Sequence, residues 1–159
     1  MRNIRPVKLL IIIFILNILE SFIAPYLINF YINLPITFLV FSLTIYNSNR
    51  NSNPLFAFLC GLYLDLISSS PFGLNAGLFS MMSYVINSYG NTFKIFSYIQ
   101  ICVFFAISSI FYIGFKNLFI SLENFSYLLL FVSLFFNTLL LLLLAMLRYY
   151  FPSMSIKYD

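Results

Sequence analysis

The sequence predicts an all-α polytopic membrane protein, a six-helix transmembrane bundle that forms a single integral membrane domain over residues 1–159. Of these 159 residues, 62% are hydrophobic and only 8% are charged, whereas about a quarter of the residues of a soluble domain are charged. The apolar runs are long and continuous, without the alternation of a transmembrane β-barrel. Because backbone groups in lipid must be hydrogen-bonded within the protein, each run is expected to form a helix.

Six apolar runs define the expected spans, at about 8–24, 34–47, 54–68, 73–90, 95–115 and 125–148. The first run follows three basic residues, and a cleaved signal peptide is the alternative interpretation of such a start. Asn17 and Glu20 interrupt this run and no Ala-x-Ala-like cleavage site follows it, so a retained helix is favoured. The second run opens at Pro35, and proline suits the first turn of a helix.

The third expected span, 54–68, is short for a full crossing and has the length of a re-entrant or interrupted segment. It follows the polar stretch 47–54, Asn-Ser-Asn-Arg-Asn-Ser-Asn-Pro, whose composition predicts a loop. A serine-proline break separates it from the fourth run. The last two runs are longer, and the sixth contains six consecutive leucines at 139–144.

The basic residues predict how the bundle is oriented. Six spans place both termini on one side, and cytoplasmic segments of membrane proteins carry an excess of Lys and Arg. With cytoplasmic N- and C-termini, Lys116 alone falls outside, and seven basic residues fall inside: Arg2, Arg5, Lys8, Arg50, Lys94, Arg148 and Lys157. The net charge of +4 is therefore attributed to topology. Nucleic-acid binding is not expected, because no stretch has the basic density of an arm or patch.

The residue inventory argues against catalysis and against a metal or other cofactor. The chain has no His, which removes a Ser-His-Asp triad and His-ligated metals. One acid within an apolar run, without His, offers no pair of nucleophile and base. Cys60 and Cys102 are interpreted as buried thiols that act as small hydrophobes. The sequence thus predicts a protein that is not an enzyme and has no cofactor.

Asp65 is the acid that lies within an apolar run, between Leu64 and Leu66. An ionisable group in a span costs a few kcal/mol at the membrane centre and less near the interface, so it is expected to face protein or water. One interpretation is structural, with the carboxylate accepting hydrogen bonds from Ser68, Ser69 or nearby backbone N–H groups. The other is a site that binds a partner or a small polar ligand. A proton relay is the least favoured, because no second acid shares the helix.

Small residues follow one face of the third span and one face of the fourth. Ala57, Gly61 and Asp65 are four apart and so lie on one side of the third helix. On the fourth, the small residues are Gly73, Ala76, Gly77 and Ser80, with a Gly-x-x-x-Gly pair among them. Small residues let helix backbones approach closely in lipid. Tight packing is expected at these positions, with the third helix against the fourth.

The break between these two spans is Ser-Ser-Ser-Pro-Phe-Gly-Leu-Asn, residues 68–75. Pro71 disfavours a helical conformation at Ser70, and serines there are expected to cap the next helix. The N-terminus of that helix is electropositive and could hold the Asp65 carboxylate. This arrangement would pin two short helices into a corner.

The same stretch resembles the central signature of MreD, the bacterial rod shape-determining membrane protein family. That signature has the form Gly-x-x-x-Asp, two to four further residues, a small residue and Pro-x-Gly-x-Asn. The corresponding residues of this chain, which form its candidate partner-binding or structural corner, are Gly61, Asp65, Ser69, Pro71, Gly73 and Asn75. The resemblance covers residues 61–76; elsewhere only length and hydropathy are similar. Ile36 stands where the family often has an acid or amide, and the loop at 90–94 is less basic than usual.

The resemblance implies a non-enzymatic subunit of the bacterial cell-elongation machinery in the cytoplasmic membrane. MreD-like proteins act with MreC, with the actin-like MreB, with the glycosyltransferase RodA and with a class B penicillin-binding transpeptidase, and they guide lateral peptidoglycan synthesis. Their fold is similar to that of the S components of energy-coupling-factor vitamin transporters. An MreC-like protein and membrane lipid are therefore the expected partners.

A small-solute-binding subunit of a transporter is the alternative function, with a cavity under the same corner. The chain offers few charged or hydrogen-bonding groups to define a solute site, and it has no Trp to stack on a vitamin ring. These features favour the non-enzymatic elongation subunit, which binds protein partners, over the transporter subunit.

Overall fold

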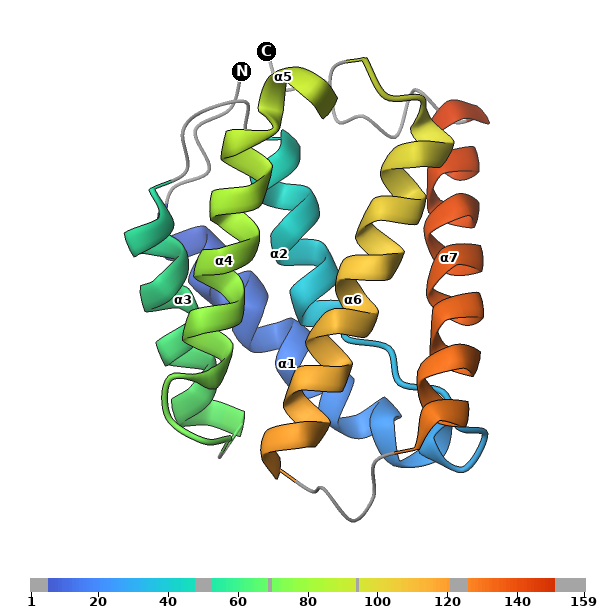
Figure 1. Ribbon diagram of the computed structural model, residues 1–159. Coiled ribbons are helices and arrows are strands. Elements are labelled where there is room, and N and C mark those ends of the chain that lie inside the picture. The colour runs from blue at the N-terminus through green and yellow to red at the C-terminus, as the bar shows by residue number, and fades with distance from the viewer. Residues whose placement is uncertain (1–5, 48–52, 69, 94, 121–125, 151–159) are drawn as a thin grey trace.

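The computed structural model describes residues 6–47, 53–68, 70–93, 95–120 and 126–150 (Figure 1). Within these ranges the chain contains helices and no strands. The elements are α1 (Pro6–Ile28), α2 (Ile36–Asn47), α3 (Pro54–Ser68), α4 (Leu74–Ser88), the short α5 (Gly90–Phe93), α6 (Tyr98–Ile120) and α7 (Tyr127–Tyr150). The all-helical class predicted from composition is confirmed.

Three helices are long and apolar enough to cross a membrane: α1 from Lys8 to Ile28, α6, and α7 from Tyr127 to Met146. α2 and α3 are shorter apolar helices of 12 and 15 residues, and at 1.5 Å per residue they extend about 18 and 22 Å. The structure thus combines three helices of membrane-spanning length with shorter ones.

Several helix ends differ from the ranges expected from hydropathy, among them the end of α1 and both ends of α6, which continues to Ile120. α1 continues through Pro25 to Ile28, although a proline inside a helix removes one backbone hydrogen bond. α6 begins at Tyr98, after a capping box: Gln100 N–H donates to Ser97 Oγ (3.4 Å) and Ser97 N–H donates to Gln100 Oε1 (2.8 Å). The start of the fifth apolar run therefore lies before the helix.

The six longer helices alternate in direction, so that the start of α1 and the end of α7 lie at the same end of the molecule (Figure 1). α3 and α4 form a hairpin with the most extensive contact of any helix pair, and α6 and α7 form the next most extensive. α2 packs against α1, α4 and α6, so it is the central helix. Its neighbours cover most of its surface, and most of its residues are buried or partly buried.

Aromatic rings fill the space where α2, α4 and α6 meet. Phe41 stacks on Phe79 with ring centroids 4.2 Å apart, and Phe38 stacks on Tyr112 at 4.5 Å. Polar side chains are also buried in the bundle, namely Thr37, Ser42, Asp65, Asn75, Ser83, Ser109, Ser133 and Asn137. Large apolar side chains cover the outer faces of α1, α6 and α7, as at Phe22, Phe111 and Phe131. Polar groups inside and apolar groups outside are the distribution expected in lipid.

Candidate functional site

Asp65 lies near the end of α3, is only 2% exposed, and holds the N-terminus of α4. Its Oδ2 accepts hydrogen bonds from the backbone N–H groups of Gly73 (2.9 Å) and Ala76 (3.4 Å). Its Oδ1 accepts from Asn75 N–H (3.1 Å) and from Ser70 Oγ (2.7 Å). The first N–H groups of a helix have no partners within the helix and carry partial positive charge. The Asp65 carboxylate therefore acts as a capping group for α4, although it belongs to another helix.

The loop that brings α4 to Asp65 depends on Gly73. Gly73 precedes the first residue of α4, has φ 93° in the left-handed region, and makes no side-chain cap. Glycine adopts this conformation without the steric penalty of other residues. The expectation that serines cap α4 is corrected for Ser70, whose hydroxyl donates to Asp65. Ser69 lies outside the described residues.

Asn75 extends the hydrogen bonds of Asp65 from α4 to α6. Its Nδ2 donates to Ser70 Oγ (2.9 Å), and its Oδ1 accepts from the Tyr112 hydroxyl (2.6 Å). Asn75 is fully buried, and each polar atom of its side chain has a partner. The network joins the α3–α4 loop to the aromatic core, because the Tyr112 ring stacks on Phe38 of α2. Nothing in the local sequence around Tyr112 distinguishes it from the other tyrosines, and sequence reasoning missed it.

α3 and α4 approach most closely at Gly61. A Cβ atom built on Gly61 would lie 2.4 Å from Ala76 Cα, 2.6 Å from Ala76 N and 2.6 Å from Asn75 O. These are backbone atoms, which cannot rotate away as a side chain can. Ala57, one turn before Gly61, is also buried. The Cβ-free surface of Gly61 is therefore what allows α4 to lie close enough for its N-terminus to reach Asp65.

The predicted small-residue face of the fourth helix needs correction. Gly73 precedes the helix instead of lying in its packing face. Gly77 is exposed, with no atom within 4 Å of a Cβ built on it, and Ser80 donates to Gly77 O (2.9 Å) within the same helix. The close contact is made by Gly61 and Ala76, so the Gly-x-x-x-Gly pair is not the surface that meets α3.

Glu20 repeats the role of Asp65 at a second helix. Its Oε2 accepts hydrogen bonds from the N–H (2.9 Å) and the Oγ1 hydroxyl (2.7 Å) of Thr37, in the first turn of α2. An acid on α1 thus caps α2, as the acid on α3 caps α4. From sequence, Glu20 was noted for interrupting an apolar run; its partner 17 residues away has no local signature.

The arrangement is a structural joint. Both oxygens of Asp65 accept hydrogen bonds from its own chain, and these bonds join α3 to the loop and to the first turn of α4. The part of the chain described contains no group of three or more Cys, Asp or Glu side chains that could hold a metal ion. We call this joint, made by Gly61, Asp65, Ser70, Gly73 and Asn75, the α3–α4 corner.

Comparisons with models of protein families, with curated proteins and with solved structures found no match to this chain. The resemblance of residues 61–76 to the MreD signature therefore stands on those residues alone. What the geometry adds is a physical role for four of the signature positions: the contact at Gly61, the capping at Asp65, the turn at Gly73 and the hydrogen bonds of Asn75.

Proposed function

We propose that this protein is a non-enzymatic membrane subunit of the bacterial cell-elongation machinery, which regulates rod shape and lateral peptidoglycan synthesis by binding an MreC-type partner. The observation that carries the proposal is that four of the signature residues converge on one joint: Gly61, Asp65, Gly73 and Asn75. Each of these four residue types has a physical role there, which supports reading the pattern as a signature rather than as chance in an apolar sequence. MreB, RodA and a class B penicillin-binding transpeptidase belong to the wider proposed assembly.

The proposed membrane arrangement has six spans, with α1, α2, α3, α4, α6 and α7 as an S-component-like bundle in the bacterial cytoplasmic membrane. The excess of basic residues at the termini and in alternate loops supports cytoplasmic N- and C-termini. On this orientation the α3–α4 corner faces the outside of the cell. That is the side on which an MreC-type partner and the peptidoglycan enzymes would meet it.

The exposed side chains at the corner are the proposed partner contact. Asp65 and Asn75 are buried and cannot touch a partner directly, so their role is to hold the loop in one shape. Phe72, at the tip of the loop, is 75% exposed, and Leu66 on α3 is also exposed. An exposed aromatic side chain on a rigidly held loop is the kind of residue that anchors protein–protein contacts.

The transporter alternative receives less support from the corner. A solute site needs convergent polar groups that are free to bind. The two oxygens of Asp65 accept hydrogen bonds from the Ser70 hydroxyl and from Gly73 N–H. The side-chain amide of Asn75 is hydrogen-bonded to Ser70 and Tyr112. Among the described residues, each side-chain oxygen and nitrogen atom of Asp65 and Asn75 therefore already has a hydrogen-bond partner within the chain.

Depletion of the protein in its host is expected to make rod-shaped cells round and swollen. The physical reason is that lateral wall synthesis would lose the subunit that positions it, while division continues. Microscopy after repression of the gene measures this, with re-expression of the same chain as the control. Unchanged shape together with a new nutrient requirement would instead support the transporter and overturn the proposal.

Replacement of Phe72 with alanine is expected to remove most of the co-purification of an MreC-type partner without loss of protein from the membrane. The matched control is Phe131→Ala on α7, because Phe131 is also 75% exposed but lies away from the corner. Affinity purification from membranes, with equal amounts of each variant, gives the comparison. If Phe72→Ala and Phe131→Ala retain the partner equally, the corner is not the partner surface.

A further inference from the structure

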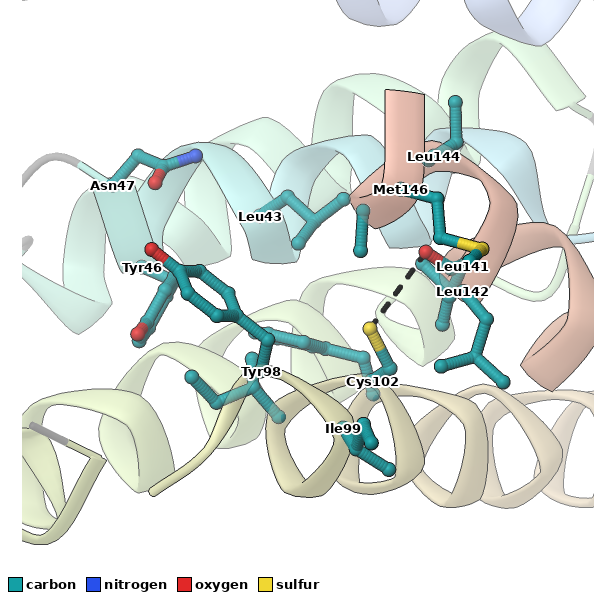
Figure 2. A pocket seen from close by; sticks show the side chains of 13 residues that line it. Leu43, Tyr46, Asn47, Tyr98, Ile99, Cys102, Leu141, Leu142, Leu144 and Met146 are labelled. Carbon is teal, nitrogen blue, oxygen red and sulfur yellow. Dashed lines mark hydrogen bonds between the residues drawn. The ribbon is translucent and has the colours of Figure 1, made fainter. Parts of the chain in front are cut away.

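A pocket lies between the end of α2, the start of α6 and the end of α7 (Figure 2). Its volume is about 720 Å³, within the range of about 300–1,000 Å³ that is typical of sites for small molecules. The helix ends around it lie at the opposite end of the bundle from the α3–α4 loop (Figure 1). It is therefore separate from the corner and from the proposed partner contact.

The wall of the pocket is mostly apolar. Its inner part is made by buried side chains of α6 and α7, including Cys102, Phe105 and Leu141. The Cys102 thiol is directed to Leu141 O at 3.7 Å, and this contact joins the two helices at the wall. This inner part disfavours charged or strongly polar groups, because no polar side chain there would replace the water they lose.

Polar groups gather at one side of the pocket. Figure 2 shows the hydroxyl groups of Tyr46 and Tyr98 and the amide of Asn47 together, apart from Cys102 and the leucines of α7. Asn47 is the last residue of α2 and Tyr98 the first of α6, so these groups mark helix ends. Tyrosines at the ends of membrane helices are typical of the water–lipid interface. The pocket thus has a polar mouth and an apolar interior, the polarity of a lipid molecule.

The rim of the pocket continues into the apolar outer surface of the bundle. Ile99, Leu144 and Met146 line the pocket and are also exposed. They belong to α6 and α7, two of the helices that are long and apolar enough to cross a membrane. A hydrocarbon chain in the surrounding bilayer could therefore enter sideways between these helices without crossing water.

The size of the pocket favours a single chain over a helix of another protein. A membrane-spanning helix is about 10 Å across and 30 Å long, which is a volume of about 2,400 Å³. The pocket provides about 720 Å³, less than a third of that. A flexible chain of methylene groups has no such minimum width and can fill it.

We propose that this pocket binds one acyl chain of a membrane phospholipid, with the headgroup near Asn47 and Tyr98. Hydrogen bonds from the neutral amide and hydroxyl groups would orient the glycerol or ester region. The chain would pack on Cys102 and Leu141. The bound lipid would fill the space that separates α2 from α6 and α7 at this end, which stabilises the bundle independently of any protein partner.

Photo-crosslinking in a bilayer tests this proposal. The full chain is placed in vesicles of phosphatidylethanolamine and phosphatidylglycerol that include phosphatidylglycerol with a diazirine on one acyl chain. After irradiation, mass spectrometry locates the labelled residues. We expect saturable labelling of inner-wall residues such as Cys102 and Leu141, which are buried from bulk lipid, and competition by unlabelled phosphatidylglycerol.

Two variants on α7 separate the pocket from the outer surface. Ala145 lines the pocket, so Ala145→Phe is expected to fill it and to abolish inner-wall labelling. Leu143 is 52% exposed and does not line the pocket, so Leu143→Phe is expected to leave that labelling unchanged. If Ala145→Phe does not fold, saturation and competition in the native chain decide the matter. Labelling that does not saturate and is confined to the exposed faces would overturn the proposal. The pocket would then be expected to bind another occupant, such as a second copy of the chain or a partner protein.

Discussion

Replacing Gly61 with alanine is expected to destabilise the folded bundle by about 3 kcal/mol, the upper end of the usual cost of overpacking a core. The added Cβ would lie 2.4 Å from Ala76 Cα and 2.6 Å from two further backbone atoms. Because none of these atoms can move by side-chain rotation, α3 and α4 would have to separate. Separation would also lengthen the hydrogen bonds from Gly73 and Ala76 to Asp65, so the effect reaches the whole corner.

The matched control for Gly61→Ala is Gly77→Ala. Both positions lie inside helices that form the same hairpin, but a Cβ at Gly77 meets nothing within 4 Å. Alanine in an exposed helix interior is favoured over glycine by about 1 kcal/mol, so Gly77→Ala is expected to be neutral or slightly stabilising. Unfolding of the two purified variants in the same detergent gives the comparison. Equal stability of Gly61→Ala and the native protein would show that the helices are not in close contact at this point.

Much of the helical arrangement could be predicted from hydropathy, because long apolar runs in a chain with few charges leave helices as the available structure. The predicted range 54–68 coincides with α3, whereas the predicted start of the fifth run differs from the start of α6. The difference has a local cause that hydropathy does not register. Ser97 and Gln100 form a capping box, which sets where the helix begins.

The Asp65–α4 contact could be anticipated because its parts are close in sequence: an acid, a proline that stops the helix, and a glycine that restarts it. Tyr112 and Glu20 could not. Tyr112 reaches Asn75 across 37 residues, and it is one of 12 tyrosines in the chain. Which of them points into the core depends on how α6 is rotated against α4, and many rotations suit an apolar sequence equally well.

The small-residue face of the fourth helix shows how sensitive such patterns are to a helix boundary. The interpretation of Gly73 and Gly77 as one packing face assumed that the helix includes Gly73. The helix starts at Leu74 instead, and Gly73 adopts a left-handed turn. Gly61 then meets Ala76, while Gly77 is exposed. Ala76 and Gly77 are adjacent small residues, so the sequence alone does not show which of them packs against α3.

Asp65→Asn is expected to destabilise the protein by about 3 kcal/mol, although the two side chains have nearly the same shape. Both oxygens of Asp65 accept hydrogen bonds, from Ser70 and Asn75 on one side and from Gly73 and Ala76 on the other. An asparagine replaces one acceptor with an NH₂ group, which would face N–H donors and could not bond to them. The favourable interaction of a negative charge with the α4 N-terminus is lost as well, and a buried unsatisfied group adds about 1–3 kcal/mol.

Glu20→Gln is the matched control, because Glu20 also caps a helix but uses one oxygen only. Among the described residues, both of its hydrogen bonds, from the Thr37 N–H and hydroxyl, go to Oε2. A glutamine can present its carbonyl oxygen to both donors and turn its NH₂ group away, so we expect a loss of about 1 kcal/mol or less. Thermal unfolding of the two variants, together with their amounts in the membrane, measures the difference. Equal losses for Asp65→Asn and Glu20→Gln would mean that charge alone, and not the use of both oxygens, gives Asp65 its role in holding α4.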